Sequence, residues 1–191
     1  MERTPVIKTN YAVNSAKAAF LSVLAAAIIG ASTNAINGAL SPDYFRAVLG
    51  WDFPGIWAAS IAQGIMEGAT YGVLFAMVVL LALLIFRRHI GWPAIRLHIL
   101  KAMGLVYLAW LVGGCIGLLL AGISPDIYRQ QYVDLALEAG ALLKFAWVGG
   151  SINGAMYGGL LSAVVIAIGI KNEASSTSDI IALQGFEEIN D

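Results

Sequence analysis

The sequence predicts an all-α membrane protein with four transmembrane helices, built as two parallel-repeat hairpins. Three observations predict this fold class: the composition, four long apolar stretches and an internal repeat. Of the 191 residues, 59% are apolar and only 12% are charged. A soluble domain carries about 25% charged residues, so most of this protein's surface must face lipid rather than water.

The apolar stretches cover roughly 18–40, 57–86, 99–123 and 142–170. Each is long enough for a helix to cross a hydrocarbon core of about 30 Å. None alternates like a membrane β-strand, and a helix satisfies its backbone hydrogen bonds internally. A cleavable signal peptide is the alternative for the first stretch, but its removal would leave the repeat incomplete.

The repeat consists of two sequence blocks that recur in the same order. The first copy reads SPDYFR from Ser41 and GIMEGATYG from Gly64, and the second reads SPDIYR from Ser124 and GSINGAMYG from Gly150. Nine of these fifteen positions are identical. Because each copy is a whole hairpin, both run in the same direction, which predicts a pseudo-twofold axis along the membrane normal.

The predicted order is a cytoplasmic lead (1–16), a first hairpin (17–86), a basic linker (87–96), a second hairpin (97–170) and an acidic tail (171–191). Eight of the eleven lysines and arginines lie on the side of the termini and the linker. The positive-inside rule therefore places both termini in the cytoplasm of a plasma or inner membrane. The tail is either disordered or a short amphipathic helix for a partner.

Glycines recur every fourth residue in the second and fourth spans. These helix-packing positions are Gly64, Gly68, Gly72, Gly150, Gly154 and Gly158. Residues i and i+4 share a helix face, and strips of small residues let membrane helices approach closely. The strips are expected either to pack inside the protomer, second span against fourth, or to dock a neighbouring subunit.

The Ser-Pro-Asp blocks predict short interfacial helices in both outer loops, because serine suits the N-cap, proline the first helical position and aspartate the first turn. Tyr44 and Phe45 are expected to point toward lipid. Each block also carries an arginine, which is expected either to pair with a carboxylate or to bind a lipid phosphate. The candidate carboxylates are Asp43, Asp52 and Glu67 in the first copy and Asp134 and Glu138 in the second. The residues of these outer loops are Ser41, Asp43, Arg46, Ser124, Asp126 and Arg129.

Glu67 and Asn153 occupy the same position of the two copies. Glu67 lies twenty residues before Arg87, about 30 Å of helix, which places it near the outer edge of the hydrocarbon. Similar arithmetic predicts one polar layer made of Glu67, Asn153, Asn34 and Asn37. Tyr71 and Tyr157 lie one turn below Glu67 and Asn153 and can join this layer as their i, i+4 neighbours. The layer is either a closed clasp that ties the helices together or an acidic vestibule for a cation or proton.

No arrangement of residues predicts an enzyme, a metal site or a cofactor. The chain has two histidines and one cysteine, Cys115, and no histidine lies at the depth of Ser151 to act as its base. The expected partners are the lipid bilayer and either further copies or the subunits of a membrane complex, and not nucleic acid. The leading hypothesis is a non-enzymatic protein that acts through tight packing and assembly. The alternative is a small channel or carrier that uses Glu67.

Overall fold

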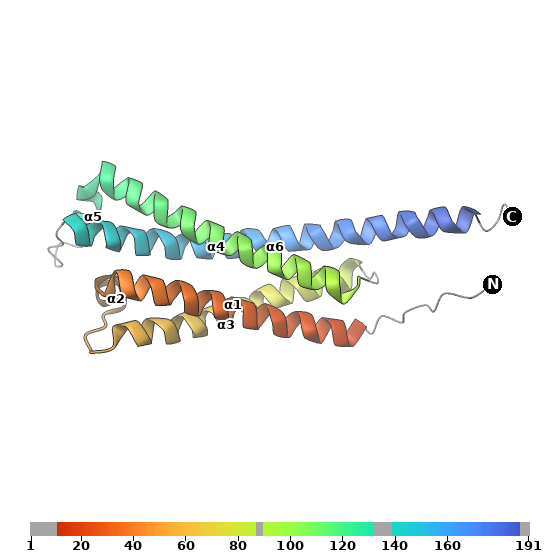
Figure 1. The fold of residues 1–191 in the computed structure, drawn as a ribbon, viewed down its shortest axis with the longest axis horizontal. Helices are drawn as coiled ribbons and strands as arrows, with labels where there is room; N and C mark the ends of the chain where they lie inside the picture. The colour runs from red at the N-terminus through yellow and green to blue at the C-terminus, as the bar shows by residue number, and fades with distance from the viewer. Residues whose placement is uncertain (1–10, 87–89, 132–138, 188–191) are drawn as a thin grey trace.

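A computed structural model describes residues 11–86, 90–131 and 139–187. Its long helices are α1 (Tyr11–Leu40), α3 (Ile56–Phe86), α4 (Trp92–Ile123) and α6 (Ala139–Glu187) (Figure 1). Two short helices, α2 (Pro42–Leu49) and α5 (Pro125–Gln131), follow α1 and α4. All four long helices are long and apolar enough to cross a membrane, so the prediction of a four-span helical protein is confirmed at this level.

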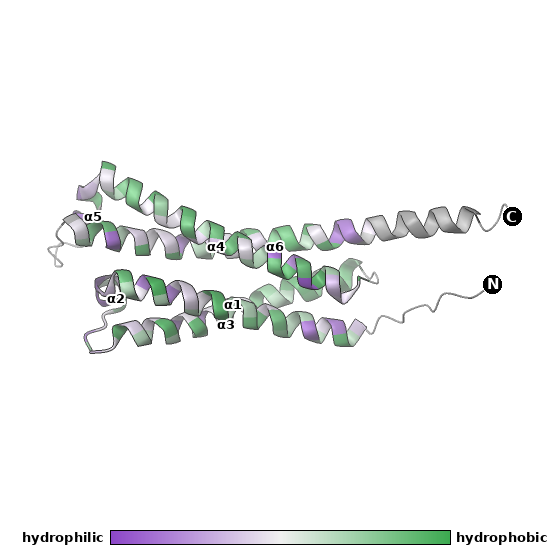
Figure 2. Ribbon diagram, in the orientation of Figure 1, coloured by the Kyte–Doolittle hydropathy of each residue, from purple (hydrophilic) through white to green (hydrophobic). Residues whose placement is uncertain are grey.

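The outer surfaces of the spans are apolar, as a lipid environment requires. Within an apolar segment of 18 residues taken from each span, only 17–28% is buried inside the protein. Hydrophobic residues recur along the coloured parts of all four long helices (Figure 2). In water this would be an aggregating surface, whereas lipid chains solvate it without cost.

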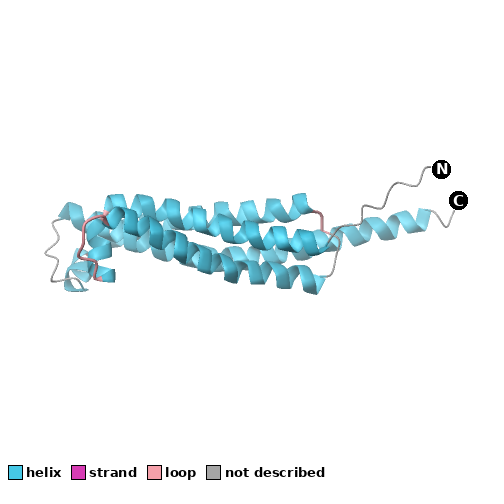
Figure 3. Cartoon of the chain, turned by 90° about the horizontal axis from the view of Figure 1, so that it is seen from below, coloured by secondary structure: helices cyan, strands magenta, loops and turns pink. Residues whose placement is uncertain are grey.

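The long helices form two antiparallel pairs, α1 with α3 and α4 with α6, and each pair is packed along its length. The pairs meet more sparingly, through α3 with α6 and α1 with α4. Both short helices lie at one end of the bundle (Figures 1 and 3). The start of α1 and the last turns of α6 lie at the other end, which we call the terminal end.

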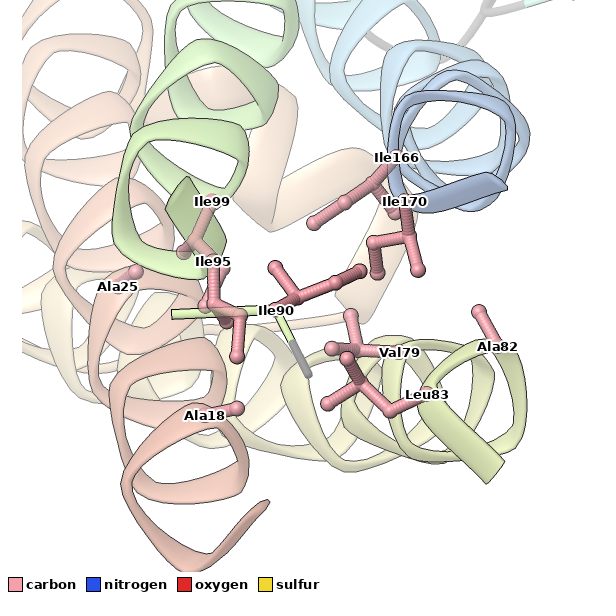
Figure 4. Close-up of a cluster of buried hydrophobic side chains, with 10 residues drawn as sticks. All are labelled: Ala18, Ala25, Val79, Ala82, Leu83, Ile90, Ile95, Ile99, Ile166 and Ile170. Atoms are coloured by element: carbon pink, nitrogen blue, oxygen red, sulfur yellow. The ribbon is translucent and has the colours of Figure 1, made fainter. Parts of the chain in front are cut away.

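The two pairs are joined near the terminal end by a purely apolar core. Its ten buried residues come from α1, α3, α4 and α6 and from Ile90, which precedes α4. Figure 4 shows Ile90 lying between the isoleucines of α4 and α6 and the buried side chains of α3. Close packing of shaped side chains, rather than the hydrophobic effect, holds such a core together in lipid.

At the opposite end, α2 packs onto α6 instead of pointing its aromatic residues to lipid, so that expectation is wrong. Phe45 is only 1% exposed and packs with Val148. The ring centroids of Tyr44 and Phe145 are 5.1 Å apart. Only Ser41 separates α1 from α2, so α2 folds back across the end of the bundle and its aromatic side meets α6.

Both Ser-Pro-Asp blocks begin short helices, as predicted. Ser41 occupies the N-cap position of α2, but its side chain makes no capping hydrogen bond. The first turn relies instead on proline, on Asp43 and on the backbone bond from the Tyr44 amide to the Ser41 carbonyl. Likewise, the Ile127 amide donates to the Ser124 carbonyl at the start of α5.

Helix α6 does not end with its apolar stretch but continues through the predicted tail as far as Glu187, beyond the rest of the bundle (Figure 1). No proline or glycine interrupts residues 171–184, so nothing in the sequence stops the helix there. At the boundary between the predicted linker and the second hairpin, α4 starts at Trp92 and has Pro93 in its first turn. The second half of the predicted linker is therefore helical.

Candidate functional site

The glycine strips pack inside each helix pair. A Cβ atom added to Gly64 would strike the backbone of Gly30, and one added to Gly68 would strike Ala26. In the other pair, Gly150 meets Gly113 in the same way and Gly154 meets Ala109.

The expectation that the second span packs its strip against the fourth is therefore wrong. The strip on α3 faces α1, and the strip on α6 faces α4. The atoms that a side chain would meet are mostly backbone carbonyls, so the helices of each pair touch backbone to backbone. The pairing follows the small residues that face each strip, Ala26 and Gly30 on α1 and Ala109 and Gly113 on α4.

The buried half of the predicted polar layer lies where α1 meets α3 and α6. Asn34 and Asn37 are both buried. The hydroxyl of Ser60 lies 3.1 Å from the carbonyl oxygen of Asn34, and the hydroxyl of Ser151 lies 3.1 Å from Oδ1 of Asn37. The second bond joins the two helix pairs across the bundle, from α1 to α6.

This cluster is not fully satisfied by the described residues. The Ser151 hydroxyl also lies 3.0 Å from the carbonyl of Val148, and its single proton serves one acceptor at a time. Nδ2 of Asn37 has no hydrogen-bond partner in the described part of the chain, although the residue is 0% exposed. The ring nitrogens of Trp110 and Trp147, whose rings meet edge to face at 5.6 Å, also lack partners among those residues.

The other half of the layer faces outward. Glu67 is exposed, and its carboxylate accepts a bond of 2.8 Å from Nε2 of Gln63 on the same helix. Asn153 is also exposed and donates to the carbonyl of Gly149, one turn away. Tyr71 and Tyr157 are 55% and 64% exposed.

The expectation that these six residues face one another inside the bundle is therefore wrong for Glu67, Asn153, Tyr71 and Tyr157, which are exposed. Glu67 lies three residues beyond Gly64, which meets Asn34, and seven residues beyond Ser60, so it lies about 5 Å deeper in the bundle than Asn34 and about 10 Å deeper than Ser60. Distances counted along separate helices missed this offset, because the helices differ in where they begin and in how they tilt.

The arginines of α2 and α5 form short-range pairs inside their own helices. Arg46 lies 2.7 Å from Asp43, and Arg129 lies 3.4 Å from Asp126. All four side chains are substantially exposed, so each pair contributes little to stability. Asp134 and Glu138, two carboxylates considered as partners for Arg129, lie outside the described residues.

Sequence reasoning assigned no role to the serines of this region. Ser151 aligns with Ile65 of the first copy. Ser151 is 0% exposed whereas Ile65 is 45% exposed, so the same repeat position faces the interior in one hairpin and the outside in the other. A serine opposite an isoleucine in the aligned repeat was the available signal. Ser32 and Tyr107, whose hydroxyls lie 2.7 Å apart, join α1 to α4 and were also missed.

Among the residues that the structure describes, no group of three or more His, Cys, Asp or Glu side chains is placed to hold a metal ion. Cys115 is a free, exposed thiol on α4. Comparison of the chain with protein-family models, with curated proteins and with solved structures finds no match.

Proposed function

We propose that this polytopic membrane protein is not an enzyme and acts through assembly, either with further copies of itself or as a small subunit of a membrane complex. The observation that carries this proposal is the outward position of Glu67 within a span. Glu67 lies eleven residues from the outer end of α3, about 16 Å along the helix. In a protein that does not assemble, this carboxylate would face lipid chains or the lipid headgroup region.

An ionisable side chain inside a span normally faces a bundle interior or a polar partner. Glu67 is accompanied on the outside of α3 by the exposed Thr70 and Tyr71 and by the half-buried Gln63, whose Oε1 is enclosed. Gln63 lies four residues before Glu67, and Thr70 and Tyr71 lie three and four residues after it, so all four lie on one side of the helix. A partner helix with hydroxyl, amide or basic groups would satisfy this polar strip better than lipid.

The interior supports assembly over transport. Below the buried amides, the core that joins the helix pairs is apolar. Among the described residues near this core, the buried hydroxyls of Ser22 and Ser162 bond to Ala18 and Gly159 of their own helices, and the enclosed hydroxyl of Ser15 has no partner. These residues offer little to a hydrated ion on a path through the bundle.

We further propose that the two helix pairs are duplicated hairpins related by a pseudo-twofold axis along the membrane normal, with both termini cytoplasmic. Matching contacts support the duplication. Gly72 meets Val23 of α1, and Gly158 meets Val106 of α4. The Gly30–Gly64 contact likewise corresponds to Gly113–Gly150. Val23 and Gly30 each lie 83 residues before their counterparts.

The test of assembly is the mass of the purified protein in mild detergent and in nanodiscs, compared for wild type and Glu67→Leu. We expect an oligomer whose dissociation constant rises about threefold in the variant, because interhelical polar contacts in membranes are worth about 0.6 kcal/mol on average. Met66→Leu, an exposed apolar change beside Glu67, is the matched control and should have no effect. A wild-type protein that is monomeric and without partners in both media would contradict the proposal.

The alternative function, a small channel or carrier for a cation, proton or small solute, is favoured by the buried and incompletely paired Asn37. Its predicted ligand is Glu67, so Glu67→Gln should abolish flux into proteoliposomes while leaving the fold intact. On the assembly proposal, neither wild type nor Glu67→Gln conducts above empty vesicles. A flux that Glu67→Gln removes would establish the alternative.

A further inference from the structure

A groove of about 540 Å³ runs between α3 and α6 in the half of the bundle nearest the terminal end. Val78 and Phe86 of α3 form one wall. Leu160, Ala163, Ala167 and Lys171 are among the residues of α6 that form the other. The groove opens on the lipid-facing surface, and it lies on a different part of α3 from the polar strip around Glu67.

The groove is hollow because of where the large side chains point. Ile166 and Ile170 of α6 and Val79 and Leu83 of α3 are buried in the core that joins the helix pairs (Figure 4). The neighbouring α6 positions that face outward include Ala163 and Ala167, which are only partly buried. Because these two alanines have small side chains, they leave an open groove where α3 and α6 meet. The lining of this groove is apolar except at Lys171.

The length of the groove matches one leaflet of a bilayer. Leu160 and Lys171 are separated by eleven residues, about 16 Å of helix. Half of a hydrocarbon core of about 30 Å is about 15 Å. An acyl chain that follows the groove from Leu160 therefore reaches the headgroup region of its own leaflet at Lys171.

The charge at that end selects the headgroup. Lys171 is exposed, and its ammonium is the charged group of the lining. Glu173, two residues further on, lies 3.6 Å from His98 of α4. Residues two apart point to different sides of a helix, so this carboxylate is directed toward α4 and away from the α3 side. A phosphate at the mouth of the groove thus meets a cation.

We propose that the groove binds one acyl chain of an anionic glycerophospholipid, whose phosphate lies against Lys171. The site is a lipid site of the leaflet on the terminal side. It does not depend on the assembly proposed above, because its residues are separate from Glu67 and its neighbours. On the proposed topology this leaflet is the cytoplasmic one, which carries the anionic lipids that basic residues near a span attract.

The test titrates the purified protein with phosphatidylglycerol or phosphatidylcholine and counts the bound lipids by native mass spectrometry. We expect the first phosphatidylglycerol to bind about fivefold more tightly than phosphatidylcholine, the effect of one lysine at an anionic surface. Lys171→Gln should remove this preference without changing phosphatidylcholine binding. Lys144→Gln, an exposed lysine at the opposite end of α6, should keep it.

A second pair of variants tests the acyl-chain part of the site. Ala163→Phe fills the groove and should weaken the first binding event for both lipids, whereas Leu161→Phe, on an exposed position of the same turn outside the groove lining, should not. Equal binding of both lipids by wild type, together with no effect of Lys171→Gln, overturns the proposal. So does an Ala163→Phe variant that changes the oligomer mass but not lipid binding, since a second protein chain would then occupy the groove.

Discussion

Asn37 shows how a single side chain joins the two helix pairs. It lies on α1 and is completely buried. Its Oδ1 accepts a hydrogen bond of 3.1 Å from the hydroxyl of Ser151 on α6. Because Nδ2 of the same amide has no partner among the described residues, the contact is not an optimised polar network. Buried polar groups that are partly satisfied stabilise little and mainly fix how elements are positioned.

We predict that Ser151→Ala lowers the free energy of unfolding in detergent by about 0.6 kcal/mol, and by no more than about 1.7 kcal/mol. The loss should largely disappear in an Asn37→Ala background, because the bond is already absent there. Ser162→Ala is the control: Ser162 is equally enclosed, but its hydroxyl bonds to Gly159 of its own helix. A loss from Ser151→Ala that is the same in both backgrounds would show that the two residues are not coupled.

At the level of single residues, the sequence predicted which residues are polar and inside spans but not which way they point. Glu67 and Asn153 were expected inside the bundle and are exposed, while Ser60 and Ser151 are buried. Lipid-facing and interior faces of a membrane helix are both apolar, so the amphipathic pattern that identifies the inside of a soluble protein is weak here. The glycine strips indicated one packed face of each helix, and the repeat, with serine opposite isoleucine, held further information on direction.

The helix pairs themselves depend on glycine more than on any polar contact. Gly154 and Gly159 lie five residues apart on α6 but have opposite surroundings. A Cβ at Gly154 would strike Ala109 of α4, whereas a Cβ at Gly159 has nothing within 4 Å. The regular spacing of the strip was readable in the sequence, but the identity of the facing helix was not, because α1, α4 and the other spans all carry small residues.

Gly154→Ala should therefore destabilise the protein by about 1–3 kcal/mol, the usual cost of overpacking a tight contact. Gly159→Ala should be neutral or stabilising by up to about 1 kcal/mol, because alanine favours the helix without meeting a neighbour. Thermal unfolding in the same detergent, followed by circular dichroism, measures both. Equal shifts for the two variants would mean that α4 and α6 are not in backbone contact at Gly154.

Helix α2 offers a second test at the level of elements, since its packing on α6 was not predicted. Phe45→Ala removes the most buried ring of this helix and should release α2 from α6. Val48→Ala changes a residue of the same helix that is 44% exposed and should not. Amide hydrogen exchange is the measurement: α2 should exchange faster in Phe45→Ala alone. Fast exchange already in wild type would show that α2 is not held at the end of the bundle.

For the molecule as a whole, length and composition were enough to predict four spanning helices, because crossing lipid constrains a helix far more strongly than folding in water does. The association of the spans was harder to predict. Small residues that face the glycine strips pair α1 with α3 and α4 with α6, although the shortest connection, residues 87–91, joins α3 to α4. The sequence contains no comparable constraint on how the two pairs meet. The apolar core around Ile90 and the Asn37–Ser151 bond both come from residues distant in the chain.

The topology that follows from parallel hairpins is testable with single cysteines in a Cys115→Ser background. Asp52, after α2, and Asp126, in α5, are both exposed near the same end of the bundle. Asn172, where α6 leaves the bundle, is exposed at the other end. A membrane-impermeant maleimide added to intact cells should label Asp52→Cys and Asp126→Cys but not Asn172→Cys, and all three after permeabilisation. Labelling of Asn172→Cys alone would mean that the protein has the opposite orientation in the membrane, with the two hairpins still parallel to each other. Opposite behaviour of Asp52→Cys and Asp126→Cys would mean that the hairpins enter the membrane from opposite sides, and no axis along the membrane normal could then relate them.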